Sequence, residues 1–208
     1  MNNIDRLCNN SQSAGAFAHG YFDYLKQVLD SITPESIDRL VEEFENARAT
    51  GNTIFIAGNG GSATTATSMA NDIGFDVIKK TGTEKPFRVL ALTDNTSVIT
   101  AIANDVGYAN VFLNQLKIHY RHGDKLLAIS ASGNSSNVVV AAEWVKKQGG
   151  LVISFVGFAG GKLKEISDLV VHVKSESGEY GPVEDAHLVL NHILAHWFQN
   201  KFKQDMQI

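Results

Sequence analysis

The sequence is poor in cysteine, in basic charge and in long apolar runs, and each shortage argues against a class of protein. Its 208 residues contain one cysteine, Cys8, which excludes an internal disulfide and fits a reducing cytoplasm. The net charge is -4 without a basic tract, which argues against nucleic acid as the main partner. No apolar run approaches the length of a membrane span, and the N-terminus lacks a signal peptide's apolar core. The length suits one domain with a full hydrophobic core.

The first 50 residues carry apolar side chains at helical spacing, in two runs separated by Thr33 and Pro34. Thr33 suits a helix cap and Pro34 suits the first helical position, so the second run begins there. Two helices are therefore expected before the first strand. The residues leave open whether this segment packs against another subunit or on its own sheet.

Beyond Gly51 the pattern alternates between short apolar runs and helical runs. The apolar runs are rich in Val, Ile and Leu, as in parallel strands buried on both faces; they cover 53–57, 87–93, 125–130, 151–156 and 168–173. The helical runs cover 63–73, 95–117, 135–147, 160–166 and 183–203. The segment 74–86 has the least pattern and is expected to be a surface loop.

This order predicts the α/β class, as a five-stranded, doubly wound parallel sheet flanked by helices, with two N-terminal helices. One domain is expected over residues 1–208, with a helical segment at 1–50 and an α/β core at 51–208.

Two Gly/Ser-rich turns follow predicted buried strands and precede predicted helices. Residues 130–135 read Ser-Ala-Ser-Gly-Asn-Ser, and residues 58–62 read Gly-Asn-Gly-Gly-Ser. Unpaired N–H groups at a helix start favour an anion, and an open α/β sheet binds its ligands at this edge. Neither turn matches a P-loop or a complete dinucleotide fingerprint. We expect a phosphorylated ligand held from two sides; the alternative is two ordinary turns with serine helix caps.

Five motifs occur in order along nearly the whole chain, at 58–63, 92–95, 103–105, 129–137 and 157–163. Together they resemble the sugar isomerase (SIS) family, and within it the phosphoheptose isomerases. The resemblance implies a homotetramer with active sites at subunit interfaces. It also implies conversion of sedoheptulose 7-phosphate to a heptose 7-phosphate, an aldose that enters surface-polysaccharide synthesis.

The resemblance further implies which residues act. Asp72 stands where these enzymes use a glutamate as base and metal ligand, and His192 stands where a histidine is acid and metal ligand. The expected substrate-binding residues, several of them on the two turns, are Asn59, Gly60, Gly61, Ser62, Asn104, Asp105, Ser130, Ala131, Ser132, Ser135 and Glu184. Three positions depart from the family pattern: Ser68 replaces a metal-binding histidine, Glu184 replaces a glutamine, and Ala131 replaces a threonine.

These residue types suit the implied chemistry, because moving a carbonyl between adjacent carbons requires a base near the carbons and an acid near the oxygens. Asp72, Glu184 and His192 could form a three-ligand site for a divalent metal, which is zinc in the family. Serine is a poor zinc ligand, so Ser68 weakens that expectation. Asp72 is one methylene shorter than glutamate, a withdrawal of about 1 Å that can cost ~10²-fold in rate.

The sequence therefore predicts an aldose–ketose isomerase of a phosphorylated sugar, acting through an enediol. The alternative is a non-catalytic sugar-phosphate sensor or a protein-binding tetramer, motivated by the changes at Ser68 and Asp72. An amino-sugar phosphate enzyme ranks below both, because such enzymes usually have longer chains. On the last helix we expect His187 and His196 on a solvated face or at a subunit contact, and His192 partly buried.

Overall fold

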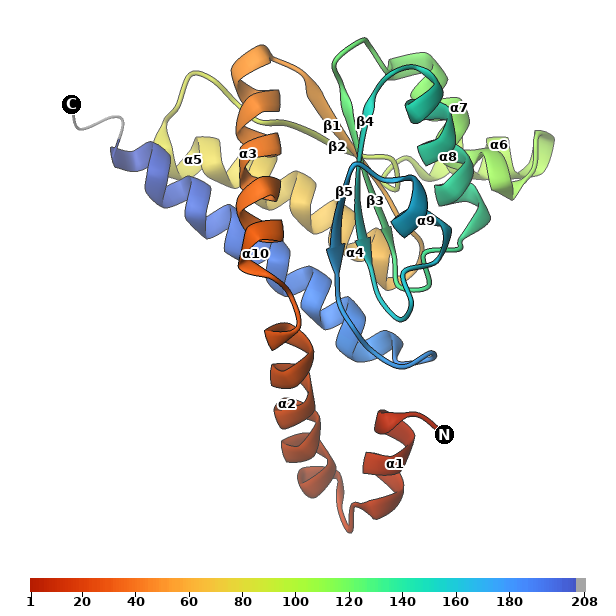
Figure 1. Cartoon of the computed structure of the whole chain (residues 1–208). Helices are drawn as coiled ribbons and strands as arrows, with labels where there is room; N and C mark the ends of the chain where they lie inside the picture. The colour runs from red at the N-terminus through yellow and green to blue at the C-terminus, as the bar shows by residue number, and fades with distance from the viewer. Residues whose placement is uncertain (205–208) are drawn as a thin grey trace.

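A central parallel sheet with helices on both faces forms the body of the molecule (Figure 1). The structure, a computed structural model, describes residues 1–204. The strands run in the order β2-β1-β3-β4-β5, and every pair is parallel. They are β1 Thr53–Ala57, β2 Arg88–Ala91, β3 Lys125–Ser130, β4 Leu151–Val156 and β5 Leu169–His172. The predicted five-stranded parallel sheet is therefore confirmed.

The central strands are apolar throughout because both faces of the sheet are covered. Every residue of β1 and β3 is buried, and alternate side chains enter opposite cores. Ile56 and Leu127 belong to one core, whereas Phe55 and Leu126 belong to the other. Full burial of such a side chain contributes roughly 1.5–3 kcal/mol, so the two cores fix which face each strand residue takes.

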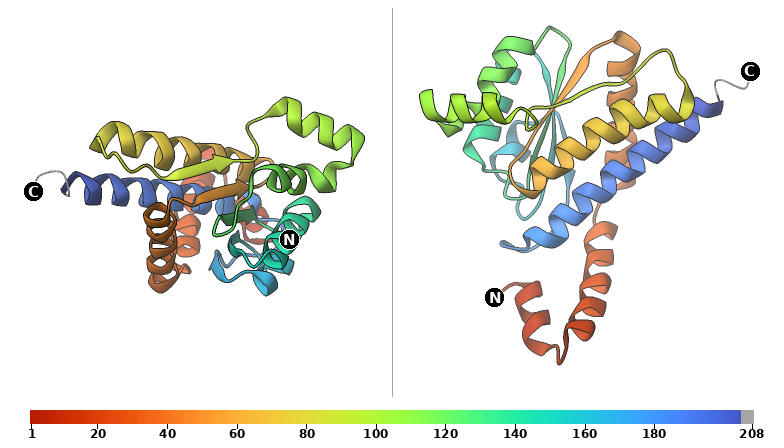
Figure 2. Two further views of the ribbon diagram at one scale, coloured as in Figure 1. Left: turned by 90° about the horizontal axis from the view of Figure 1, so that it is seen from above. Right: turned by 180° about the vertical axis from the view of Figure 1, so that it is seen from behind.

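The helices divide between the two faces of the sheet (Figure 2). The first core is closed by α3 Pro34–Thr50, α4 Gly61–Met69, the π-helical segment η1 Ala70–Asp76, α5 Val77–Thr81 and α10 Tyr180–Gln204. The second core is closed by α6 Thr96–Asp105, α7 Val111–His119, α8 Ser136–Lys147 and α9 Gly161–Ile166. No helix in residues 1–204 is long and apolar enough to cross a membrane.

The expected surface loop at 74–86 is wrong over its first half. The helical path from α4 continues through η1 and α5 and ends at Thr81. Met69, Ile73 and Val77 lie one turn apart and are fully buried, so their shared face holds this segment on the sheet. The sequence after Gly74 lacks a strong helical pattern of apolar residues, because few side chains of this helix are buried against the sheet.

The expected single helix at 95–117 is also wrong, because it is two helices with a break. α6 ends at Asp105, and Gly107 follows with φ of 96°, a left-handed conformation that favours glycine. A short 3₁₀ turn, η2 Tyr108–Asn110, then leads into α7. The break turns the chain and directs Tyr108 toward the carboxyl end of the sheet.

Three helices rather than two precede β1. The additional one, α1 Asn3–Asn10, begins with a capping box in which Asn2 and Asp5 exchange side-chain and backbone hydrogen bonds. This cap stabilises a helix in an N-terminal segment of polar composition. Cys8 lies exposed on that helix.

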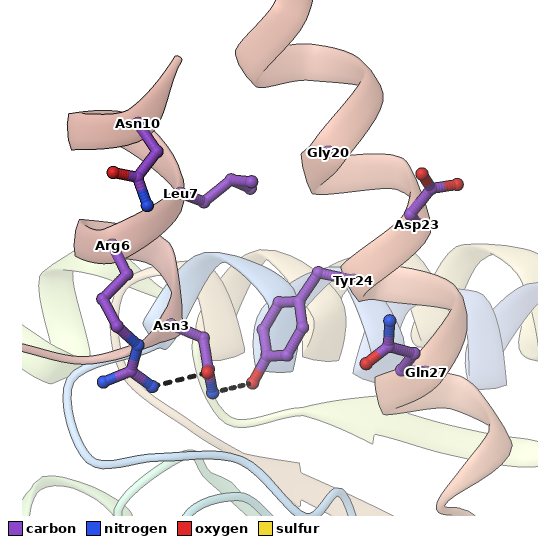
Figure 3. Close-up of a pocket in the computed structure, with 8 residues that line it drawn as sticks. All are labelled: Asn3, Arg6, Leu7, Asn10, Gly20, Asp23, Tyr24 and Gln27. Atoms are coloured by element: carbon purple, nitrogen blue, oxygen red, sulfur yellow. Dashed lines mark hydrogen bonds between the residues drawn. The ribbon is translucent and has the colours of Figure 1, made fainter.

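α1 and α2 Ala14–Asp30 form an arm that projects from the body of the molecule (Figures 1 and 2). Val28 is the one fully buried side chain of α2. The arm is tied to the start of α10 by polar bonds, in which Tyr21 donates to Asp185 at 2.6 Å and Tyr24 donates to Glu179. A cavity of about 430 Å³ lies between the two helices of the arm. Figure 3 shows the residues that line it, with the Tyr24 ring at one end.

Candidate active site

The two Gly/Ser-rich turns lie side by side at the carboxyl ends of β1 and β3. These strands pair with each other at the point where the strand order reverses, which is where open α/β sheets bind ligands. We call residues 58–62 and 130–135 the loop cluster. Asn59 and Asn137, just after the second turn, exchange two amide hydrogen bonds of 2.9 Å each. The two turns are therefore joined by a direct side-chain contact.

The hydroxyl groups of the second turn face two directions. Ser130 and Ser135 share a hydrogen bond of 3.0 Å between their Oγ atoms. Ser132 Oγ instead accepts the Asn134 N–H at 3.2 Å, and Ser132 lines a cavity of about 450 Å³ on the side of β4 and β5. Ala131 packs into a small apolar cluster, where the methyl group supplies no polar contact.

The first turn is covered by an acidic side chain. A Cβ atom placed on Gly61 would lie 2.2 Å from Oε2 of Glu184, so this carboxylate rests against the start of α4. The unpaired N–H groups of a helix start favour a negative charge there. Burial raises the pKa of Glu184, and the neighbouring charge of Asp185 adds to that effect. Gly60 and Ser62 flank this contact, with Gly60 exposed and Ser62 buried.

Asp72 and His192, far apart in the sequence, meet on neighbouring helices. His192 Nε2 lies 3.8 Å from Asp72 Oδ2, and the same oxygen accepts a 2.7 Å hydrogen bond from Asn191 Nδ2. We call Asp72 and His192 the acid–base pair. The His192 side chain is 55% exposed and that of Asp72 is 21% exposed. His192 is thus open to solvent rather than partly buried, because it lies on the outer side of α10.

The loop cluster and the acid–base pair lie at different heights along the same two helices. Glu184 meets Gly61 near the start of each helix, and His192 meets Asp72 further on, so α4–η1 and α10 run in the same direction (Figure 2). At 1.5 Å per residue the two contacts are about 12–16 Å apart. Ser68 lies one turn before Asp72, between the two contacts.

Asn104 and Asp105 occupy a third place, at the exposed end of α6. Among the described residues their side chains hydrogen-bond to each other, with Asn104 Nδ2 donating to Asp105 Oδ1 at 2.7 Å. Three residues later, Tyr108 reaches the loop cluster. The loop after α6 therefore connects these two residues with the first turn.

The expected metal ligands of one chain do not gather around a common point. Within residues 1–204, no group of three or more His, Cys, Asp or Glu side chains is arranged to hold a metal ion. Asp72 and His192 are close, but Glu184 lies about 12 Å further back along α10. A resident zinc ion at these three residues remains a prediction from resemblance.

Three further polar residues contact these groups although none of them is among the expected site residues; of the three, Asn137 alone lies in one of the five motifs, at the end of 129–137. Tyr108 donates to Asn59 Oδ1 at 2.8 Å although its side chain is exposed, and Asn137 is buried beside the same amide. Asn191 contacts Asp72 as described above. The helix break at Gly107 and the relative rotation of two helices create these contacts, and neither is visible as a sequence pattern.

His187 is fully buried, which corrects the expectation of a solvated face or a subunit contact. Its side chain lies against the Phe155 ring, with the ring centres 5.6 Å apart. Burial lowers the pKa of His187 to about 4, and the backbone of Val156 opposes that shift only in part. His187 is therefore neutral at physiological pH. His196 is exposed, as expected for a solvated face.

Comparison with known proteins agrees with this arrangement. The SIS domain family model matches residues 20–157. The phosphoheptose isomerase of Aneurinibacillus thermoaerophilus is 34% identical over 198 residues, which cover 86% of this chain and 97% of that one. The phosphoheptose isomerase of Rhodospirillum rubrum is 39% identical over 144 residues, covering 69% of this chain and 74% of that one.

A solved structure supports the same relationship. The phosphoheptose isomerase of Neisseria gonorrhoeae superposes with a TM-score of 0.76 at 30% identity, covering 90% of this chain and 96% of that one. Sequence and fold thus agree over most of the chain. This chain belongs to the SIS domain family, as a phosphoheptose isomerase-like sugar-phosphate isomerase.

Proposed function

We propose that this protein interconverts sedoheptulose 7-phosphate and a heptose 7-phosphate through an enediol. The observation that carries the proposal is the acid–base pair: the two side chains at the family's base and acid positions lie 3.8 Å apart. A carboxylate and an imidazole so close together can serve adjacent atoms of one substrate. The relatives named phosphoheptose isomerase supply the substrate class.

In the proposed reaction the Asp72 carboxylate removes a proton from C1 of the ketose while His192 donates a proton to the oxygen on C2. The enediol then collapses in the opposite sense. Asp72 returns its proton to C2, and His192 takes the proton from the oxygen on C1, so both groups return to their starting states. General acid–base catalysis of this kind contributes typically 10²–10⁴-fold.

The loop cluster is proposed to bind the phosphate. Backbone N–H groups and the hydroxyls of Ser130, Ser132 and Ser135 suit a dianion that must also be released. The loop cluster and the acid–base pair of one chain are about 12–16 Å apart along the helices. From the family resemblance we propose a homotetramer in the cytoplasm, and this separation fits active sites that are completed at subunit interfaces.

The direct test is to incubate the purified protein with sedoheptulose 7-phosphate and follow formation of the aldose by NMR. We expect turnover that needs the phosphate group, so sedoheptulose itself serves as the matched control. The assay is run with added zinc, with added manganese and with a chelator. Absence of aldose under all three conditions would reject the assignment.

A second candidate is a non-catalytic sugar-phosphate sensor. It is favoured by Ser68 and Asp72, which stand where the resemblance places a metal-binding histidine and a catalytic glutamate. Asp72→Asn and His192→Ala distinguish the two candidates. The sensor function gains support if both variants leave ligand binding and every measured activity unchanged while Ser132→Ala weakens binding of the sugar phosphate.

A further inference from the structure

Two of the polar side chains of helix α10 have no exposed surface. His187 and Asn191 lie one turn apart, and each is 0% exposed. Asn191 Oδ1 and the ring nitrogens of His187 form no hydrogen bond of normal geometry among the described residues, although the Val156 backbone is close enough to the His187 ring to offset in part the lowering of its pKa by burial. An unsatisfied buried polar group costs about 1–3 kcal/mol. Apolar residues at both positions would give a more stable core, so each polar side chain requires a reason.

Asn191 has such a reason, because its amide nitrogen points at Asp72. Asn191 Nδ2 donates to Asp72 Oδ2 at 2.7 Å, and that oxygen is the one that faces His192. The other oxygen, Oδ1, accepts a 2.9 Å hydrogen bond from the exposed Asn71. The carboxylate is thus held by one donor fixed in the core and by one donor in solvent.

The buried donor fixes the direction of the carboxylate more firmly than the exposed one. A side chain packed on all sides has few accessible rotamers, whereas Asn71 is free to exchange its bond with water. Aspartate is also short, so its oxygens depend on their surroundings for placement. A misplacement of about 1 Å at a reacting group can cost ~10²-fold in rate.

We propose that Asn191 is a positioning residue that sets the Asp72 carboxylate against His192. This inference rests on the proposed role of Asp72 as base. Asn191 does not touch the substrate in this proposal; it acts through the 2.7 Å hydrogen bond alone. An amide that supplies this donor also buries an unpaired carbonyl, and the protein is less stable as a result.

The test is Asn191→Leu, which keeps most of the volume and removes the donor. We expect kcat for the ketose phosphate to fall about 10–100-fold while KM stays within about twofold. The melting temperature is maintained or raised, because the unpaired carbonyl is removed with the amide. A purely structural residue would give the opposite combination, a lower melting temperature with kcat retained by the folded fraction.

His187→Leu is the matched control, because it removes an equally buried polar group one turn earlier on the same helix. We expect its kcat to stay within about twofold of wild type. Equal losses of kcat in both variants would overturn the proposal, since the effect would then belong to the core in general. If Asn191→Leu does not fold, Asn191→Ala, which also removes the donor, is measured against the same control and under the same criterion.

Asp72→Asn separates this inference from the proposed function. If Asp72→Asn abolishes turnover and Asn191→Leu leaves kcat unchanged, the base assignment stands and the positioning role fails. If Asp72→Asn leaves turnover unchanged, the base assignment fails, and the positioning role fails with it.

Discussion

The loop cluster and the acid–base pair are built in different ways. The loop cluster is made of turns, in which neutral amides and hydroxyls satisfy one another, as Asn59 does with Asn137 and Ser130 with Ser135. The acid–base pair is made of two ionisable side chains on regular helices, supported from behind by a buried amide. The first arrangement suits binding and release of an anion. The second suits proton transfer, because helices fix the distance between the two groups.

The largest expected effect is a fall in kcat when the acid–base pair is changed, in contrast to a rise in KM when the loop cluster is changed. Asp72→Asn removes the proposed base, so kcat falls about 10²–10⁴-fold while affinity for the ketose phosphate is retained. Ser135→Ala removes a hydroxyl of the loop cluster, so KM rises and kcat changes little. Steady-state kinetics with calorimetric binding measures both. If Asp72→Asn changes only KM, the division between binding and proton transfer is wrong.

The next effect concerns the packing of the loop cluster. Gly133 has φ of 66°, and a Cβ there would lie 1.9 Å from the backbone oxygen of Gly160. Gly133→Ala is expected to destabilise the fold by about 2–5 kcal/mol through conformational strain and steric overlap. Gly149→Ala is the control: its φ is 74° and no atom lies within 4 Å, so strain alone, about 1–2 kcal/mol, applies. Denaturant unfolding compares the two variants, and equal losses would exclude a packing role for Gly133.

A third effect concerns the core behind the acid–base pair. His187 binds a proton near pH 6.5 when unfolded but only near pH 4 when folded. Between these values the unfolded chain holds more protons at this residue, so the contribution of His187 to stability is largest above pH 6.5 and is lost as the pH drops toward 4. The loss amounts to about 3 kcal/mol. Denaturant unfolding at several pH values should show a flatter profile for His187→Leu; identical profiles would contradict burial of a neutral His187.

The smallest effect tests the link between α6 and the loop cluster. Tyr108→Phe removes the 2.8 Å hydrogen bond to Asn59 Oδ1, so that the Asn59 amide is held by Asn137 alone. A loss of about 1 kcal/mol in substrate binding, near fivefold in KM, is expected. Tyr120→Phe is the matched control, since it also removes one tyrosine hydrogen bond, the 2.9 Å bond to the Asp124 backbone, which lies before β3 at the opposite edge of the sheet. Similar KM values for both variants would remove Tyr108 from the binding site.

Much of the sheet and of the loop cluster could be predicted from the sequence, because both depend on contiguous residues. Short runs of Val, Ile and Leu predict the buried strands, and each of the two turns follows such a run directly. The errors lie where local pattern is weak. The helix through Ile73 and Val77 is held by a sparse apolar face, and the break at Gly107 depends on one backbone conformation.

The sequence by itself determined the order of the five strands along the chain, the two Gly/Ser-rich turns and the family resemblance, because these are local in the chain. Only the tertiary structure decided that Asn191 meets Asp72, that Glu184 covers the start of α4, and that His187 is buried. Such contacts depend on how one helix is rotated and shifted against another. That alignment is set by the packing of the whole core, and no spacing within a single helix records it.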